Sequence, residues 1–237
     1  MKHPMLIALF AAVAIILGAF APALWRMAAG PPAQTAAESG LPWQVAVDAS
    51  GRSTVFGLTL PGTTLAQARQ RWGDDVQVAV MARRGQPGAL EAYLENFRAA
   101  AINGRLVLAA DPGAPAVARL RENAVHNEPV DAEARRYTLR ADDLPEALRA
   151  PLVGITFIPA AQLDAATLRA RFGEPAERLL DAAPAGAGRI EQWLYPSIGL
   201  AVALDAKGRD VMQFVAPADF ERLLRAPLLA AGALPVR

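Results

Sequence analysis

Two stretches of the 237-residue sequence match each other at an offset of 100 positions, and this repeat constrains the fold more than any other feature. The matched blocks are residues 69–73 with 169–173, residues 90–94 with 190–194 and, with a small length change, residues 104–107 with 208–211. Because similarity at a fixed period is typical of duplicated units, we predict two tandem copies of one structural unit. The alternative is that common helix-ending and strand residues produced the matches independently.

The second copy has the clearer pattern of elements. Apolar residues recur at helical spacing in residues 161–172, and Gly173 follows where a helix ends in a left-handed conformation. Pro175 then prevents the helix from continuing. Branched and aromatic residues predict three strands, over residues 190–195, 200–204 and 210–215.

The first copy is expected to repeat this order. Thr63 or Thr64 can cap a helix over residues 65–72. Residues 89–97 have helical propensity, but the repeat predicts a strand, and we follow the repeat. Asn103-Gly104 is a strong signal for a hairpin turn, because both residues tolerate positive φ.

The remaining segments give shorter patterns. Further strands are predicted over residues 43–47, 53–60, 76–81, 137–139 and 153–158. Short helices are predicted over residues 117–123, 144–148 and 220–224. Residues 126–133 are polar and predict a loop, and the end after Pro227 has no pattern and is expected to be irregular.

Residues 168–175, 193–195 and 200–209 carry a resemblance to the SmpA/OmlA-type periplasmic modules. In that pattern a helix ends at Gly-x-Pro, and a meander follows whose last turn carries Asp-x-x-Gly. The tandem form resembles the beta-lactamase inhibitor protein fold. The resemblance implies helices layered on a curved antiparallel sheet, and binding to other proteins rather than catalysis. The first copy departs from it by lacking a proline after Gly73-Asp74, and the chain lacks the lipid-bearing cysteine of SmpA-type proteins.

The N-terminus contains an uncharged run over residues 5–25. As a helix rising ~1.5 Å per residue it would span about 32 Å, enough to cross a bilayer core of about 30 Å. Trp25 and Arg26 would then lie at the far interface. A cleaved signal peptide is the alternative, although Pro22 is a poor first mature residue, and a buried core helix is a third reading. Lys2 favours a cytoplasmic N-terminus, so the bulk of the chain would be periplasmic.

These patterns together predict an α+β protein with two tandem helix-plus-antiparallel-sheet modules after an N-terminal transmembrane helix. The predicted segments are a membrane anchor or signal segment (1–27), a flexible linker (28–41), a first α+β module (42–125), a connector (126–150) and a second α+β module (151–237).

No combination of residues in the sequence indicates catalysis or metal binding. The net charge of +1 gives no general attraction for nucleic acid, and the absence of cysteine excludes disulfides and thiolate catalysis. His126 stands alone in a polar segment and is expected at the surface. The adjacent aspartates 74–75 and 142–143 are expected to serve helix ends. We therefore predict no enzyme activity, cofactor, metal or small-molecule ligand.

Two arginine pairs are candidates for contact with anions. Arg83-Arg84 and Arg135-Arg136 could contact anionic lipid or a partner, but a solvated surface is the favoured reading.

The aromatic residues give the better indication of a binding surface. Trp193 and Tyr195 lie two positions apart on one predicted strand, so both point to the same face of the sheet. If helices cover that face they are core residues, which is the favoured reading; if the face is open they could anchor a partner. Trp43 is less constrained and could do either.

The function expected from these observations is a non-catalytic protein-binding or envelope-assembly module. It would be held at the bacterial inner membrane by one helix, with another envelope protein as its possible partner. The alternatives are a hydrolytic enzyme with scattered carboxylates and a structural spacer. A soluble periplasmic protein after signal cleavage is the alternative location.

Overall fold

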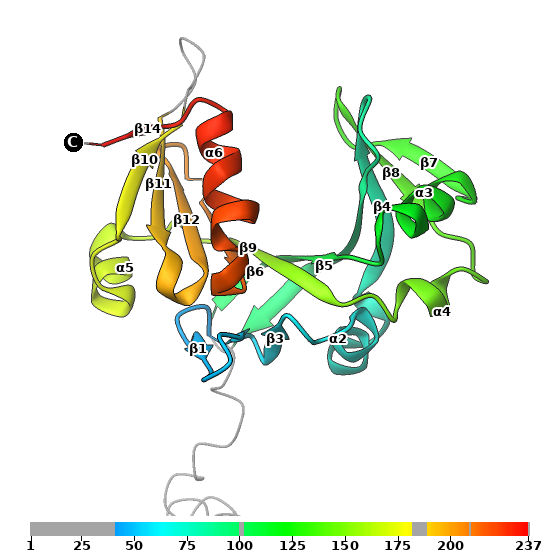
Figure 1. Cartoon of the computed structure of the whole chain (residues 1–237), viewed down its shortest axis with the longest axis horizontal. Coiled ribbons are helices and arrows are strands. Elements are labelled where there is room, and N and C mark those ends of the chain that lie inside the picture. Colours follow the sequence, from blue (N-terminus) through cyan, green and yellow to red (C-terminus); the bar gives the residue numbers. More distant parts are fainter. Residues whose placement is uncertain (1–40, 100–101, 182–188, 209, 237) are drawn as a thin grey trace, which may run out of the picture. The chain divides into compact units, whose positions relative to one another are not determined.

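The computed structural model describes residues 41–99, 102–181, 189–208 and 210–236. These residues form a mixed structure in which a few helices pack on one 11-stranded antiparallel sheet (Figure 1). The α+β class is therefore confirmed. The predicted anchor lies outside the described residues, as does nearly all of the predicted linker. Among the helices that are described, none is long and apolar enough to cross a membrane.

The large sheet has the strand order β14-β10-β11-β12-β13-β9-β6-β5-β4-β8-β7. Its strands are β4 (Gln77–Arg83), β5 (Ala89–Ala99), β6 (Ile102–Ala110), β7 (His126–Pro129), β8 (Ala134–Thr138), β9 (Leu152–Pro159), β10 (Glu177–Leu180), β11 (Ile190–Tyr195), β12 (Leu200–Asp205), β13 (Val211–Val215) and β14 (Leu234–Pro235). A separate three-stranded sheet consists of β1 (Ala46–Val47), β2 (Ser53–Val55) and β3 (Leu58–Leu60).

The helices are short. They are α2 (Leu65–Trp72), α3 (Ala114–Glu122), α4 (Leu144–Ala147), α5 (Ala165–Phe172) and α6 (Ala226–Ala230). Single helical turns are η1 (Gly73–Asp75), η2 (Pro196–Ile198), η3 (Pro217–Asp219) and η4 (Glu221–Arg225), and the last two lead directly into α6.

Helices α2 and α5 begin and end in the same way. The Thr64 hydroxyl accepts a hydrogen bond from the Gln67 backbone N–H at 3.4 Å, and the Asp164 carboxylate accepts one from Thr167 at 2.8 Å. Each helix ends at a glycine with positive φ, 74° at Gly73 and 79° at Gly173. The predicted start at residue 161 is wrong, because Asp164 caps the helix and Ala165 begins it.

One face of the large sheet carries the main core. Along a row that crosses the sheet it presents Trp193, Val202, Met212, Phe157, Leu106 and Leu94. Helices α2 and α5 and the small sheet pack on this side, which we call the helix-covered face. Phe56 of the small sheet contacts the rings of Phe97 and Phe157, with centroids 5.1 and 5.4 Å apart. The small sheet therefore joins the core at the middle of the large one.

The opposite face is covered over only part of its width. Leu194, Ala201 and Val215 on this side pack against Phe220 and Leu224 of the run from η3 to α6, which we call the C-terminal helical segment. Figure 1 shows α5 and α6 on opposite sides of β11 and β12. Over β5, β6 and β9 the corresponding side chains are half-buried or exposed. We call this uncovered part the open face.

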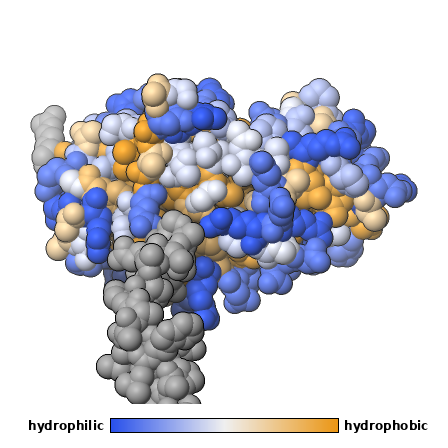
Figure 2. All heavy atoms as spheres, turned by 90° about the horizontal axis from the view of Figure 1, so that it is seen from below, coloured by the Kyte–Doolittle hydropathy of each residue, from blue (hydrophilic) through white to orange (hydrophobic). Residues whose placement is uncertain are grey.

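Seen from below, apolar residues form patches that hydrophilic residues separate (Figure 2). The visible surface on this side therefore presents no single continuous apolar area.

Several further elements differ from the sequence-based expectation. The single strand predicted over residues 53–60 is a hairpin of β2 and β3, because Phe56 and Gly57 turn the chain with φ of 54° and 75°. The polar segment predicted as a loop contains the edge strand β7, which pairs with β8. The chain end predicted as irregular continues α6 and then forms β14, which pairs with β10. Strand β10 itself has no counterpart among the predicted strands.

Asn103-Gly104 is not a turn, so that prediction is wrong. Asn103 pairs with Arg98 and Gly104 pairs with Phe97 inside the β5–β6 ladder. A Cβ atom on Gly104 would lie 2.4 Å from the Ile158 carbonyl oxygen and 2.5 Å from the Phe157 ring. Glycine is therefore present because the backbone of β9 and an aromatic ring approach closely, not because the chain reverses.

Candidate binding face

Trp193 and Tyr195 lie on the helix-covered face and are buried, with 1% and 4% exposure. The Trp193 indole donates to the Glu191 carboxylate at 3.0 Å, and the Arg169 guanidinium of α5 lies 4.6 Å from its ring centroid. The Tyr195 hydroxyl donates to the Gly173 carbonyl oxygen at 3.2 Å, and burial raises the pKa of this phenol. Both residues are therefore core residues, which was the favoured interpretation, and a partner could reach them only after α5 had moved.

Trp43 is half-buried against the same helix. The guanidinium of Arg171 lies 4.9 Å from its ring centroid. Its ring also helps to line a small apolar hollow of about 50 Å³ with Phe157 and Phe172. These contacts give Trp43 a packing role, because they hold the start of the described chain against α5. A binding role for Trp43 stays a prediction.

Residues of β5 and β11 that match in the sequence at the offset of 100 point to opposite faces of the large sheet. Tyr93 corresponds to Trp193 in the sequence, yet Tyr93 lies on the open face while Trp193 is in the main core. Leu94 is in the main core, whereas Leu194 packs against the C-terminal helical segment. The alternation within residues 90–95, apolar and then polar or aromatic, could have placed Tyr93 on an open face without the repeat.

Tyr93 forms a cluster on the open face with Glu95 and Arg105. The Tyr93 hydroxyl donates to the Glu95 carboxylate in a short hydrogen bond. Burial and the Glu95 carboxylate raise the pKa of the Tyr93 phenol, and Arg105 partly offsets this by lowering it. The cluster thus presents a tyrosine and an arginine, two residue types that are enriched at protein interfaces, next to one acid.

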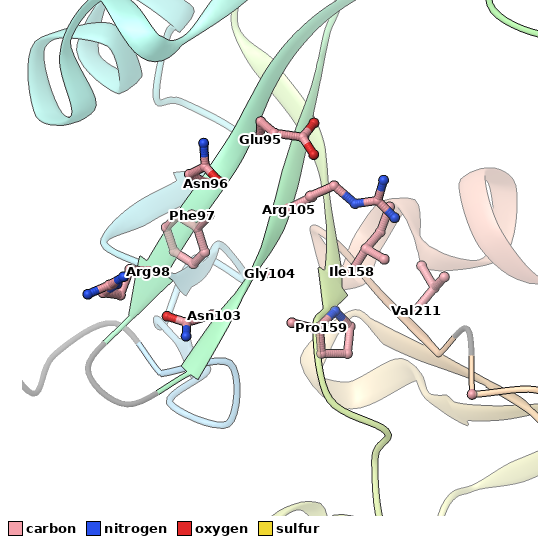
Figure 3. A pocket seen from close by; sticks show the side chains of 12 residues that line it. Glu95, Asn96, Phe97, Arg98, Asn103, Gly104, Arg105, Ile158, Pro159 and Val211 are labelled. Atoms are coloured by element: carbon pink, nitrogen blue, oxygen red, sulfur yellow. The ribbon is translucent and has the colours of Figure 1, made fainter.

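A bulge in β5 places the acid of this cluster at the edge of a hollow. Between Leu94 and Phe97 the register of β5 against β6 shifts by one residue. Figure 3 shows the Glu95 and Arg105 side chains on the same side of the strands as Ile158 and Val211. These residues line a hollow of about 710 Å³ whose walls are both polar and apolar.

Glu91 is a second acid on the open face, and no basic side chain of the described residues pairs with it. It lies directly opposite Ala79 of β4 and Ala109 of β6, two residues with no polar side chain. No described residue donates a hydrogen bond to its carboxylate or pairs with it. Burial raises the pKa of the Glu91 carboxyl above its usual value. Sequence reasoning missed this residue because its isolation depends on small side chains on two neighbouring strands.

The described residues contain no group of three or more acidic or histidine side chains that could hold a metal ion. His126 is exposed on the edge strand β7, as predicted for a surface residue. Asp74 lies at the end of α2, as predicted, but its carboxylate pairs with Arg69 instead of capping the helix. Asp143 precedes α4 but makes no side-chain cap, and instead accepts a hydrogen bond from Asn123 at 3.2 Å.

Comparison of the chain with protein-family models, with curated proteins and with solved structures found no match. Any function must therefore be inferred from the residues of this chain and their geometry.

Proposed function

We propose that this protein is a non-catalytic binding module of the cell envelope, and that it contacts another protein through the open face. The observation that carries the proposal is the uneven coverage of the sheet. Over β10–β13 the C-terminal helical segment buries the second face, while over β5, β6 and β9 the same face presents Tyr93, Glu95 and Arg105. Aromatic and arginine side chains contribute most to binding energy at protein interfaces.

The isolated carboxylate of Glu91 indicates the chemistry of the partner. A half-buried acid without a counter-charge carries a desolvation cost, which its raised pKa reflects. A lysine or arginine from a partner would remove that cost by pairing with it. We therefore propose that the partner inserts a basic side chain near Glu91, beside an apolar contact with Val107 or Ile158.

Site-specific cross-linking in membranes tests this proposal. A photo-cross-linking amino acid in place of Val107 should form a covalent adduct with one envelope protein, and Glu91→Gln in the same chain should reduce its yield. The matched control places the cross-linker at Gln70, which is exposed on α2 on the other side of the sheet. No adduct at position 107, or equal yields at both positions, would contradict the open face as the binding surface and favour a structural spacer.

We further propose that residues 1–27 anchor the chain in the inner membrane and that the rest is periplasmic. The uncharged run over residues 5–25 and the preceding Lys2 support this. Full-length protein should stay with the membrane fraction after alkaline carbonate extraction. Recovery of a shorter soluble form would show cleavage of the segment and rule out the anchor.

Duplication of one unit is also part of the proposal. The shared caps of α2 and α5 support it, and so does an ion pair that recurs at the offset of 100. Arg69 Nε lies 3.1 Å from the Asp74 carboxylate, and Arg169 Nε lies 3.1 Å from the Glu174 carboxylate.

A hydrolytic enzyme is the alternative function, and one observation favours it. Glu91 has a raised pKa, which a general acid requires. If the protein is an enzyme of this kind, hydrolysis of ester, amide or glycosidic test substrates should be detectable and should disappear with Glu91→Gln. Hydrolysis that is unchanged by this substitution would exclude Glu91 as its general acid.

A further inference from the structure

Two hairpin tips meet at the end of the sheet that carries β7. Strand β4 pairs with β8 so that Arg83 lies opposite Ala134 and Ala82 lies opposite Arg135. The β4–β5 turn and the β7–β8 turn are therefore neighbours, although they are far apart in the sequence. Between them lies a hollow of about 500 Å³. Its lining includes Arg83, Arg84, Arg121 and Arg135, and we call it the arginine hollow.

Neutral groups hold three of these arginines in place. Arg84 donates to the Ala132 carbonyl oxygen at 3.5 Å, and Arg135 donates to the Asn127 side-chain oxygen at 3.0 Å. Arg121 donates to the Gln86 carbonyl oxygen at 2.9 Å and stacks 5.0 Å from the Tyr137 ring centroid. Among the described residues, no carboxylate forms an ion pair with any of the four arginines. Neutral hydrogen-bond acceptors therefore orient Arg84, Arg121 and Arg135 without neutralising their charge.

Other arginines of the chain show the contrast. Arg136 is the next residue after Arg135 on β8, and its guanidinium lies 3.7 Å from the Glu128 carboxylate. Arg119, Arg169 and Arg225 likewise pair with carboxylates. These arginines are each paired with a carboxylate, whereas the four of the arginine hollow are not.

The two acids that line the hollow do not cancel its charge. Asp131 accepts hydrogen bonds from the backbone N–H groups of Glu133 and Ala134, both at 2.7 Å. These bonds, with a smaller contribution from Arg83, lower the pKa of the Asp131 carboxyl. The Asp131 carboxylate therefore forms its hydrogen bonds within the β7–β8 turn and not with the arginines. Glu133 is exposed, so four arginines face two acids and the lining has a net positive charge.

We propose that the arginine hollow binds the phosphate group of an anionic ligand. A guanidinium has five N–H donors in a planar fork that fits phosphate oxygens, and each of these side chains uses only part of that capacity. Val130 lies beside the hollow on the β7–β8 turn and is 56% exposed, so an apolar contact is available next to the charge. An anionic phospholipid headgroup and a soluble phosphate ester share this chemistry.

Two probes on the full chain in neutral detergent or bilayer separate these sources. The first is inorganic pyrophosphate, measured by calorimetry in detergent. The second is the difference in binding between vesicles of phosphatidylcholine with phosphatidylglycerol and vesicles of phosphatidylcholine alone. Every variant carries residues 5–25, which would insert into both kinds of vesicle. Taking the difference between the two vesicle types removes this shared contribution to binding.

The test variant is Arg84→Gln combined with Arg135→Gln. Each arginine near an anionic surface contributes about fivefold to affinity, so the pair should reduce the lipid-dependent difference about 25-fold. Arg136→Gln removes one charge from the strand that carries Arg135, but from an ion pair with Glu128, and it should change binding by less than about twofold. The combined Arg84→Lys and Arg135→Lys variant keeps both positive charges but lacks the planar guanidinium groups. It should retain vesicle binding and lose pyrophosphate binding, and it guards against misfolding of the glutamine variant.

The outcomes are distinct. For the double glutamine variant, a loss confined to the vesicles assigns the site to a lipid headgroup, and a loss confined to pyrophosphate assigns it to a soluble phosphate ester. Loss of both assigns it to the phosphate group in either setting. The proposal is overturned if neither probe binds, or if Arg136→Gln reduces binding as much as the double variant.

Discussion

The segment from α2 to β6 and the segment from α5 to β12 use the same helix end but different strand registers. Both helices have a side-chain N-cap, a glycine C-cap and an arginine–acid pair, all at the offset of 100. The first strand after the helix has seven residues in β4 but four in β10. In the next strand, residues that match in the sequence point to opposite faces. A change of one residue is enough for this, because side chains alternate along a strand.

The two segments also differ in what covers their second face. Leu194 lies beneath the C-terminal helical segment, whereas none of the described helices covers Tyr93 and Glu95. The two segments thus both bury their helix-covered face in the main core, and only the first leaves its opposite face open. We expect binding to depend on the first segment and stability to depend more on the second.

The largest expected effect separates the two matched aromatic residues. Trp193→Ala should lower the free energy of unfolding by about 3–5 kcal/mol, because a fully buried indole leaves a cavity. Tyr93→Ala should cost less than about 1 kcal/mol, because Tyr93 is on the open face. Urea denaturation of the two variants gives both values. Equal costs would mean that the two residues occupy equivalent environments after all.

A second pair of variants compares the glycines of the third sequence match. Gly104→Ala should cost about 2–3 kcal/mol, because its Cβ would overlap the β9 backbone and the Phe157 ring. Gly208→Ala has space, since its nearest neighbour is the Gln162 side chain at 3.9 Å, but its φ of 75° costs about 1–2 kcal/mol. Thermal melting with a matched Gly85→Ala control, which has positive φ and no close neighbour, separates overlap from conformation.

The helix caps should show where the two segments agree. Thr64→Ala and Asp164→Ala each remove one side-chain acceptor from a helix N-terminus, so each should cost about 1 kcal/mol. Denaturant midpoints measure this directly. A cost at only one of the two positions would weaken the proposal that the helices descend from one unit.

The smallest effect concerns two matched acids with opposite pKa shifts. Burial raises the pKa of Glu91; Glu191 is also buried in part, but hydrogen bonds from Arg178 and Trp193 outweigh this and lower its pKa. Because the pKa of Glu91 is higher in the folded than in the unfolded state, its ionisation destabilises the fold as the pH rises from the unfolded pKa through the folded pKa. The pKa of Glu191 is lower in the folded state, so its contribution to stability is lost as the pH falls through that folded pKa. At pH 7, Glu91→Gln should therefore stabilise by about 0.5 kcal/mol and Glu191→Gln should destabilise.

Stability curves measured from pH 3 to about 8 test the signs of these two contributions. Glu91→Gln should reduce the loss of stability between acid and neutral pH, and Glu191→Gln should remove part of the gain. The same sign for both variants would contradict the different surroundings of the two acids.

The local features of the fold could be predicted from the sequence, and the long-range ones could not. Thr64, Gly73 and Gly173 mark helix ends through contacts within a few residues, and those predictions hold. The strand over residues 89–97 followed from the repeat against its own helical propensity. Strands β7, β10 and β14 are short, and they form because a neighbouring strand offers unpaired backbone groups.

The candidate site depended even more on distant residues. The interpretation of Gly104 required knowledge of where Phe157 packs, about 50 residues later in the chain. The isolation of Glu91 required two alanines on two other strands. The arginine pairs were visible as pairs, but the meeting of Arg83, Arg84 and Arg135 in one hollow, without Arg136, follows from the register of β4 against β8.

The pairing of β6 with β9 has a consequence for how the chain can be divided. These two central strands share seven aligned positions, from Gly104 opposite Pro159 to Ala110 opposite Leu152, and they join the earlier and later halves of the sheet. If the chain were cleaved between β8 and β9 and the fragments separated, each fragment would have a long edge strand with unpaired backbone N–H and C=O groups. Such fragments should reassemble into the intact sheet when mixed and precipitate when kept apart. The protein could therefore serve as a split reporter whose signal depends on fragment complementation.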